Sequence, residues 1–459
     1  MPCYKARLRR VRQPDSVFQA PLRGHRHKAS GLAREYLCGC SSTKVIHAVN
    51  YSISAGNVHI LHLILSLSPA DGGPPEVLRQ LSVAYQLAGH SVEIACLDRP
   101  DAPFLKTMTC PVHALGQSYL GRYAFSPRLT DWLRANVTRF DLVVVNGIWS
   151  YPGVALRRAA RRAHRPYGVF VHGALDPWFN KRYPLKHLKK LLYWPVQYRV
   201  LRDAKAVFFT TKAESELAKQ SFQPNAWRSV VVPYGIGDPQ REATKPHEAP
   251  AQIEKFYIAN PDLRGRRYLL FLGRIHEKKG CDLLIRAFAR VAAGAPDVHL
   301  VVAGPDQMGL QVKLQQLAED LGIAGRVHWP GLLRGDLKWG ALRACEAFVL
   351  PSHQENFGIA VVEALSVGRP VLISNQVNIW QDIVADGVGL VEEDTLAGTG
   401  QLLQKWFALS TGEREAYASG ARECFLTRFY IARTVEAIAA TLMPATALTP
   451  AASLKAHVT

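Results

Sequence analysis

Short, almost wholly apolar segments alternate with amphipathic segments along most of this chain. The first apolar segment is residues 59–67, followed by a helical pattern over 76–88 and a second apolar segment over 91–97. Apolar runs of this length are typical of buried parallel strands, and periodic segments between them are typical of crossover helices. The pattern therefore predicts α/β units built on a parallel, doubly wound sheet.

The alternation has one interruption. Before it, further strands are predicted at 142–145, 167–171, 206–210 and 230–232. After it, strands are predicted at 268–272, 299–303, 327–329, 347–350 and 370–373, with helices at 281–293, 310–321, 336–344, 359–366 and 413–442. The interruption itself, residues 235–266, is rich in Pro, Glu, Ala and Lys, which predicts a hinge between two domains that face each other across a cleft.

The predicted organisation has five parts. They are a basic, disordered extension over 1–57, an N-terminal Rossmann-like domain over 58–245, a C-terminal one over 246–425, a helix over 426–445 and a flexible tail over 446–459. The extension lacks periodicity and is rich in Arg and His. Two interpretations of it remain open: a native basic arm, or residues translated from upstream of a start near Val58.

The formal net charge of +19 is unevenly distributed. Residues 1–57 hold ten Lys or Arg and two acids, and residues 180–205 hold eight Lys or Arg and one acid. Such an excess attracts polyanions, which include nucleic acids, anionic lipids and phosphorylated substrates. The second segment mixes cations with Leu, Tyr and Trp, so it predicts either a membrane-surface helix or a packed helix with a solvated face. We expect Pro184 and Pro195 to break it into short pieces.

Cysteine usage and hydropathy bear on the cellular compartment. The eight Cys residues contain no Cys-x-x-Cys pair, which favours reduced thiols over disulfides or a zinc site. No apolar run reaches the length of about 18 residues that a membrane-spanning helix needs. The basic N-terminus is not followed by a signal-type apolar core. We therefore expect a cytoplasmic protein, with contact at the inner face of the membrane left open.

The strongest chemical signal is residues 351–365, which follow a predicted strand and begin a predicted helix. Ligands of open α/β sheets bind at such strand ends, and a helix N-terminus there can bind a pyrophosphate. Gly358 permits a close backbone approach, and sugar hydroxyls can donate to carboxylates such as Glu355 and Glu363. The spacing alone is equally compatible with Glu355 as a helix cap and Glu363 as a solvated side chain.

A second loop, residues 271–280, also joins a predicted strand to a predicted helix. Arg274 and Lys279 can bracket a diphosphate there and neutralise the charge that develops on a leaving group. The loop does not have the spacing of a Walker P-loop. By itself it is also compatible with a solvated basic turn.

Two further strand ends lie in the N-terminal half. Gly72 and Gly73 follow the first strand, where a tight turn can direct N–H groups at a phosphate or simply reverse the chain. His172 ends a predicted strand. A single His is usually structural, but a place at a strand end above the cleft favours a functional role.

Together these four segments resemble the retaining group-1 (family 4) glycosyltransferases of the GT-B fold, over about residues 59–442. The motifs that carry the resemblance are Gly72-Gly73, His172-Gly173, Gly273-Arg274 with Lys279-Gly280, and Glu355-x7-Glu363 with Phe357-Gly358. The resemblance implies an acceptor-side N-terminal domain, a nucleotide-sugar-binding C-terminal domain, and a terminal helix that crosses back to the N-terminal domain.

The resemblance also implies residue roles. Arg274 and Lys279 would hold the donor diphosphate, and Glu363 the ribose hydroxyls. Glu355 and the backbone of residues 357–359 would hold the donor sugar, with His172 beside it. The implied catalytic residues are His172, Arg274, Lys279 and Glu355, and the implied donor-binding residues are Gly72, Gly73, Gly273, Arg274, Lys279, Glu355, Asn356, Phe357, Gly358, Ile359 and Glu363.

The implied reaction transfers a hexose-type sugar, with retention, from a donor such as GDP-mannose or a UDP-sugar to a glycan or lipid-linked acceptor. Neither a metal nor another cofactor is expected. Exopolysaccharide, lipopolysaccharide or glycolipid biosynthesis are the expected processes. Residues 146–149 depart from the family pattern, in which this strand end more commonly contains His, so acceptor contacts there stay open. The alternatives are a GT-B nucleotide-sugar epimerase or phosphorylase, and a nucleic-acid-binding protein, for which we find no recognised motif.

Overall fold

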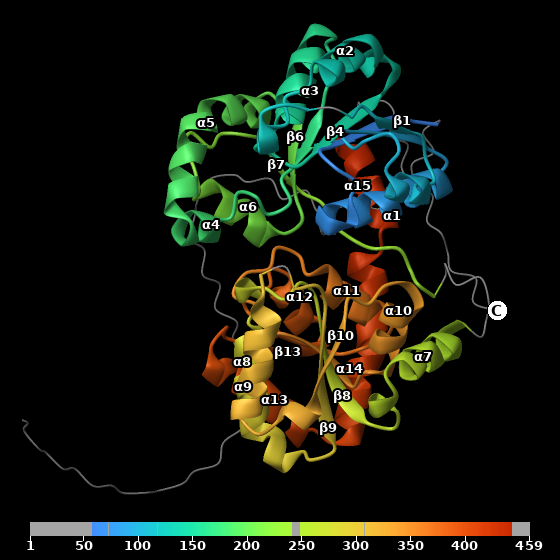
Figure 1. Cartoon of the computed structure of the whole chain (residues 1–459). Coiled ribbons are helices and arrows are strands. Elements are labelled where there is room, and N and C mark those ends of the chain that lie inside the picture. Colours follow the sequence, from blue (N-terminus) through green and yellow to red (C-terminus); the bar gives the residue numbers. More distant parts are fainter. Residues whose placement is uncertain (1–56, 72, 117, 241–247, 307, 443–459) are drawn as a thin grey trace, which may run out of the picture. The chain divides into compact units, whose positions relative to one another are not determined.

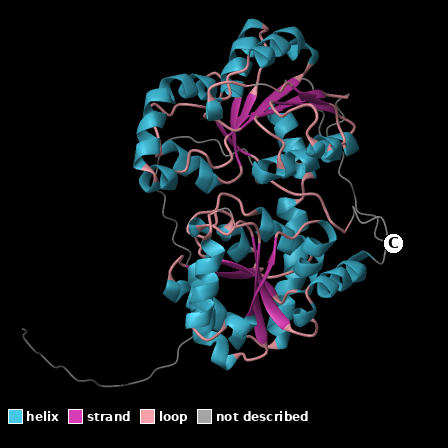
Figure 2. Ribbon diagram, viewed as in Figure 1, coloured by secondary structure: helices cyan, strands magenta, loops and turns pink. Residues whose placement is uncertain are grey.

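The computed structural model of the chain describes residues 57–71, 73–116, 118–240, 248–306 and 308–442 (Figure 1). These residues form two parallel sheets, each placed between layers of helices (Figure 2). The strands are short, and those in the middle of each sheet are almost completely buried, as the apolar runs of the sequence predict. The predicted α/β class is therefore confirmed. The predictions for the extension and the tail fall almost entirely outside the described residues.

The N-terminal sheet has seven strands in the order β3-β2-β1-β4-β5-β6-β7. Its strands are β1 His59–Ile64, β2 Ser91–Cys96, β3 Val112–Ala114, β4 Leu142–Asn146, β5 Gly168–Phe170, β6 Ala206–Phe209 and β7 Ser229–Val231. Its helices are α1 Gly73–Leu87, α2 Pro127–Asn136, α3 Tyr151–Arg162, α4 Pro177–Arg182, α5 Pro184–Arg202 and α6 Lys212–Lys219. Alternate residues of β1 belong to two different hydrophobic clusters, so both faces of this sheet are covered.

The C-terminal sheet has six strands in the order β10-β9-β8-β11-β12-β13. Its strands are β8 Arg267–Leu272, β9 Val298–Ala303, β10 Val327–Gly331, β11 Ala347–Leu350, β12 Val371–Ser374 and β13 Gly389–Glu392. Its helices are α7 Glu248–Ala259, α8 Cys281–Val291, α9 Leu310–Asp320, α10 Gly335–Ala344, α11 Ile359–Ser366, α12 Trp380–Ala385, α13 Leu396–Ala408 and α14 Thr411–Cys424. In both sheets the strand order reverses direction beside the first strand, which is where such folds bind ligands.

The chain ends by returning to the N-terminal sheet. After α14 come a π-helical turn, Phe425–Phe429, and α15, Ala432–Leu442, in place of one continuous predicted helix. Helix α15 packs against α1, and Lys205 Nζ donates to the carbonyl of Leu442 at 2.7 Å. The prediction of a crossing helix is confirmed, although it is shorter than predicted within the described residues.

Two further expectations were wrong. Helix α7 lies inside the segment predicted as a hinge, because Phe256 packs in the C-terminal core and Lys255 pairs with Asp336 of α10. The segment after Arg182 was expected to break at Pro195, yet α5 runs through it as one helix of 19 residues. Pro184 occupies the first turn, where proline is tolerated.

Candidate functional site

A cavity of about 510 Å³ is formed where the carboxyl ends of strands from both sheets come together. Its lining includes every predicted site residue except Gly72, which lies outside the described residues. These lining residues are Gly73, His172, Gly273, Arg274, Lys279, Glu355, Asn356, Phe357, Gly358, Ile359 and Glu363. The fold thus brings together four segments that are far apart in sequence.

The loop from β11 to α11 supplies a helix N-terminus to this cavity. Gly358 precedes the helix with φ of +80°, a left-handed conformation that favours glycine. The first N–H groups of a helix have no partner within it, and both Ile359 and Ala360 line the cavity. This end of α11 therefore offers N–H donors and partial positive charge to an anion.

The loop after β8 supplies three cations. Lys279 pairs with Glu355, and Lys278 Nζ donates to Oε1 of Gln354 at 3.3 Å. Burial, and then the positive charge of Arg274, lower the pKa of Lys278 to about 8. Arg274 is exposed and has no ion-pair or hydrogen-bond partner among the described residues. Its guanidinium is thus available to a ligand at the mouth of the cavity.

Glu363 of α11 is buried at 4% exposure, and it does not face solvent. Lys338 Nζ of α10 donates to its Oε1 at 2.7 Å. Lys338 is a residue that the sequence analysis missed. Among the described residues, the other carboxylate oxygen of Glu363 has no hydrogen-bond donor, and the residue lines the cavity.

On the N-terminal side, the start of α1 approaches the C-terminal sheet closely. A methyl group added to Gly73 would lie 2.7 Å from Cδ1 of Ile359, so only glycine fits without movement. Glu76 of the same helix lines the cavity and accepts hydrogen bonds from Arg79 and Gln80. The carboxylate is therefore held by its own helix.

His172 follows β5 and has a φ of +48°. Its ring stacks on Phe170 with a centroid distance of 5.0 Å, and burial lowers its pKa to about 4. The next residue is fixed by Glu214 of α6, whose Oε1 accepts from the Gly173 N–H at 2.6 Å. Glu214 is a second residue that the sequence analysis missed, and burial raises its pKa.

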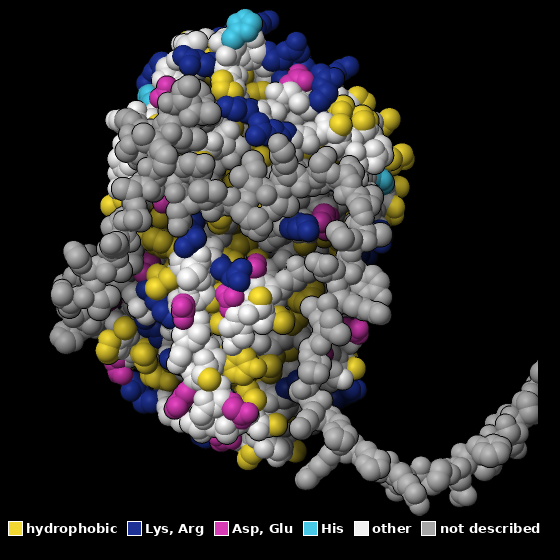
Figure 3. Space-filling view, turned by 180° about the vertical axis from the view of Figure 1, so that it is seen from behind, with side chains coloured by type: hydrophobic (Ala, Val, Ile, Leu, Met, Phe, Trp, Pro, Cys, Tyr) yellow, Lys and Arg dark blue, Asp and Glu magenta, His cyan; other side chains and the backbone are white. Residues whose placement is uncertain are grey.

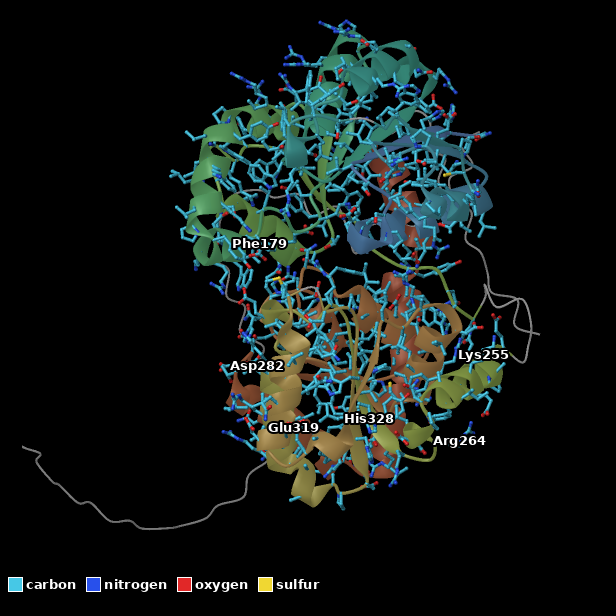
Figure 4. The ribbon with its side chains drawn as sticks, viewed as in Figure 1. Phe179, Lys255, Arg264, Asp282, Glu319 and His328 are labelled. Carbon is cyan, nitrogen blue, oxygen red and sulfur yellow. The ribbon has the colours of Figure 1, made fainter. Side chains whose placement is uncertain are left out.

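Side-chain hydrogen bonds join the two sides of the cavity. Asn356 Nδ2 donates to Oγ1 of Thr210 at 3.3 Å, and Gln354 Nε2 donates to Oδ2 of Asp176 at 3.0 Å. Phe179 of α4, labelled in Figure 4, also lines the cavity, and its ring centroid lies 5.7 Å from Lys278 Nζ. Residues of both sheets therefore shape the same site.

Within the part of the chain that the structure describes, no three His, Cys, Asp or Glu side chains are grouped so as to hold a metal ion. None of the described helices combines the length and the hydropathy that crossing a bilayer requires.

Comparison with known proteins identifies the family. The family model for glycosyl transferases group 1 matches residues 254–422, and the model for a glycosyl transferase 4-like domain matches residues 72–235. The chain is a group-1 glycosyltransferase family member. The two matches divide at the connection between the two sheets, and together they include all the cavity segments.

Relatives of this family member share part of its length. It is 31% identical to the D-inositol 3-phosphate glycosyltransferase of Geodermatophilus obscurus over 268 residues. The aligned residues make up 56% of each chain. It is 41% identical over 109 residues to the protein of that name from Mycolicibacterium gilvum, or 23% of this chain and 24% of that one. The chain thus spans about half or less of the length of these curated relatives.

Solved structures share the fold. The Anabaena protein HepE, in complex with UDP and glucose, superposes with a TM-score of 0.66 at 21% identity, covering 84% of this chain and 99% of that one. WaaG, a glycosyltransferase involved in lipopolysaccharide biosynthesis, gives a TM-score of 0.60 at 19% identity, covering 82% and 98%. The two-sheet architecture with its returning helix is thus the GT-B fold of this family.

Proposed function

We propose that this chain transfers a hexose-type sugar from a nucleoside-diphosphate donor to an acceptor, with retention and without a metal. The observation that carries the proposal is the single cavity that combines the N-terminus of α11, three cations of the β8 loop and two carboxylates of the β11–α11 segment. The donor-binding and catalytic roles of these residues are part of the proposal. A uridine nucleotide is the first donor to test, because HepE has been crystallised with UDP and with UDP-glucose.

In this proposal each of the site residues has a separate role. Arg274, Lys279 and the N–H groups at Ile359 stabilise the negative charge that develops on the leaving diphosphate. Glu355, freed from Lys279 when the lysine turns to phosphate, accepts hydrogen bonds from sugar hydroxyls. Glu363 accepts them from the ribose.

Bond breaking and bond formation take place on the same face of the sugar. The bond from the anomeric carbon to the phosphate oxygen breaks, and a bond to the acceptor oxygen forms. The acceptor proton passes to the leaving phosphate oxygen. No protein nucleophile is required in this scheme, and the cations of the β8 loop supply the positive charge that phosphate departure needs.

Calorimetric titration with UDP, GDP, ADP and dTDP in the presence of EDTA tests the donor site. We expect one nucleotide to bind, and Lys279→Ala and Glu363→Ala to weaken that binding at least tenfold. Lys255→Ala is the matched control, because Lys255 is an exposed lysine that pairs with Asp336 away from the cavity lining. Normal binding and turnover by both site variants would exclude this site.

An assay of donor turnover with and without acceptor separates the alternatives. A transferase consumes the donor and extends the acceptor. A nucleotide-sugar epimerase would convert the donor without an acceptor, and a phosphorylase would need phosphate. Loss of activity in EDTA, restored by a divalent cation, would contradict metal independence. The anomeric configuration of the product, read by NMR, tests retention.

The exposed side chains of α5 support two further parts of the proposal. The acceptor is lipid-linked, and the protein contacts an anionic membrane at its cytoplasmic face. Leu185, Leu188 and Leu192 are 79%, 59% and 81% exposed, and their spacing places them along one side of the helix. Residues 184–202 contain five Lys or Arg and no acid. In Figure 3, hydrophobic side chains gather at the upper right edge, where α5 runs. Exposed leucines flanked by cations match an anionic bilayer surface.

Vesicle sedimentation tests this contact. We expect binding to vesicles that contain phosphatidylglycerol, weaker binding to phosphatidylcholine alone, and loss of binding in Leu188→Glu/Leu192→Glu. Val312→Glu is the matched control, because Val312 of α9 is an aliphatic residue of similar exposure (71%). Equal binding by the two variants would exclude α5 as the contact. Exopolysaccharide, lipopolysaccharide and glycolipid assembly all use lipid-linked acceptors. A water-soluble inositol phosphate is the competing acceptor to assay.

A further inference from the structure

A polar chain of three side chains runs across neighbouring strands beneath the cavity. His62 of β1, Asn146 at the end of β4 and His172 after β5 belong to strands that are adjacent in the sheet. Asn146 Nδ2 lies 3.1 Å from His62 Nδ1, and Asn146 Oδ1 lies 3.2 Å from His172 Nε2. His62 is 1% exposed and Asn146 is 7% exposed, so the connection is protected from water.

The surroundings of Asn146 fix which way its amide points. Its Nδ2 lies 3.2 Å from the carbonyl oxygen of Leu63, an atom that can only accept a hydrogen bond. The two hydrogens of the amide nitrogen are therefore used by that carbonyl and by Nδ1 of His62. The amide oxygen, which can only accept, is left facing His172.

This orientation determines the proton position on His172. At neutral pH the ring carries one proton, since burial lowers its pKa to about 4. Because the amide oxygen of Asn146 accepts, the proton belongs on Nε2, and Nδ1 carries a lone pair. Nδ1 has no hydrogen-bond partner among the described residues, and the ring lines the cavity.

We propose that Asn146 is a positioning residue that holds His172 as the Nε2–H tautomer, so that Nδ1 accepts a hydrogen bond from a sugar hydroxyl in the cavity. The ligand half of this proposal rests on the proposed function, while the tautomer half concerns the protein alone. In the opposite tautomer, Nδ1–H would be a donor, and two acceptors, Nε2 and the Asn146 oxygen, would face each other. Asn146 therefore selects for a hydroxyl that donates to the site.

Selective ¹⁵N labelling of histidine tests the tautomer. In the full-length protein, with the His172 signals assigned by their absence in His172→Gln, we expect Nε2 at a protonated and Nδ1 at an unprotonated ¹⁵N shift at pH 7. Asn146→Leu, which keeps the branching and the number of side-chain heavy atoms but removes both hydrogen-bonding groups, should lose this single-tautomer signature. Asn146→Asp keeps an acceptor for Nε2–H and should retain it. A protonated Nδ1 in the wild type, or an unchanged signature in Asn146→Leu, would overturn the proposal.

Kinetics test the consequence. We expect Asn146→Leu to lower kcat/KM about 10- to 100-fold, by analogy with the outer-shell partners that orient metal-ligating histidines. UDP binding should change less than threefold, because the diphosphate groups are held by the C-terminal loops. A kcat/KM within twofold of the wild type would overturn the role in positioning. A correct tautomer signature in a protein that binds no nucleotide would refute the proposed function and leave the role of Asn146 in fixing the tautomer standing.

Discussion

The C-terminal sheet lines the cavity with charged side chains, whereas the N-terminal sheet lines it mainly with side chains held by buried hydrogen bonds. On the first side Arg274 has no ion-pair or hydrogen-bond partner among the residues that the structure describes, and Lys279 and Glu355 form an ion pair. On the second side His172 is held through Asn146, and Gly173 through Glu214. Both sets lie at the carboxyl ends of parallel strands, so the difference is one of chemistry and not of position.

Because of this difference, the two halves can contribute differently to one reaction. Charges act over several ångströms and tolerate small displacements, so they suit the capture of a diphosphate. A buried hydrogen-bond network stabilises a ligand only at hydrogen-bond distance, so it suits the alignment of a sugar hydroxyl. We therefore expect substitutions on the C-terminal side to change nucleotide affinity, and substitutions on the N-terminal side to change turnover or stability.

The largest expected effect is that of Arg274→Ala. Because this arginine has no protein partner among the described residues, its removal leaves no buried group unpaired and should leave the melting temperature unchanged. Its loss from the diphosphate should lower kcat/KM by about 10²- to 10³-fold. Steady-state kinetics with Arg290→Ala, an exposed arginine of α8, as the control measure this. Equal kinetics for the two variants would mean that Arg274 does not reach the donor.

A smaller effect of a different kind is expected from Glu214→Leu. The carboxylate accepts hydrogen bonds from the Gly173 and Thr210 N–H groups and from the Thr210 hydroxyl, at 2.6 to 2.8 Å. Leaving these buried donors unsatisfied should reduce the free energy of unfolding by about 3 kcal/mol. Urea unfolding measures the loss. At a temperature where the variant is folded, its affinity for UDP should change less than threefold. A larger change would show that Glu214 also contributes to donor binding.

The pair of Lys338 and Glu363 connects affinity with stability. Lys338→Met leaves the buried Glu363 carboxylate without its ammonium partner and should cost about 2 kcal/mol of stability. Adding Glu363→Gln removes the unpaired charge, so the double variant should recover much of the melting temperature but not UDP binding. Thermal unfolding and calorimetry on both variants check this. A double variant that binds UDP normally would remove Glu363 from the donor site.

The contrast also explains which site residues the sequence could predict. The residues of the C-terminal loops form a local motif, so Arg274, Lys279, Glu355 and Glu363 are identified within two short segments. Their partners are not local. Asn146 is 26 residues from His172, Glu214 is 41 residues from Gly173, and Lys338 is 25 residues from Glu363.

The fold was predicted in the same uneven way. Apolar runs predicted the central strands to within a few residues, because burial on both faces leaves a clear pattern. The short edge strand β3 is only partly buried, and no apolar run indicated it. Helix α7 was missed because its composition resembles a linker, and the tertiary contacts that stabilise it are distant in sequence. The sequence also could not indicate that α5 continues through Pro195, since neighbouring packing and not propensity decides that.

The smallest expected effect is a proton taken up when the nucleotide binds. In the free protein the pKa of Lys278 is lowered to about 8, so at pH 8.5 about three quarters of the lysine is unprotonated. A diphosphate placed beside it favours the ammonium form and raises this pKa, so UDP binding should draw protons from the buffer. Well below pH 8 the lysine is charged in both states, and the uptake should vanish. Calorimetry at pH 8.5 in buffers of different ionisation enthalpy measures the number of protons. Lys278→Met should reduce it, whereas Lys255→Met should not. Uptake that is equal in the two variants would assign the proton to another group, and the diphosphate would then lie beside a cation other than Lys278.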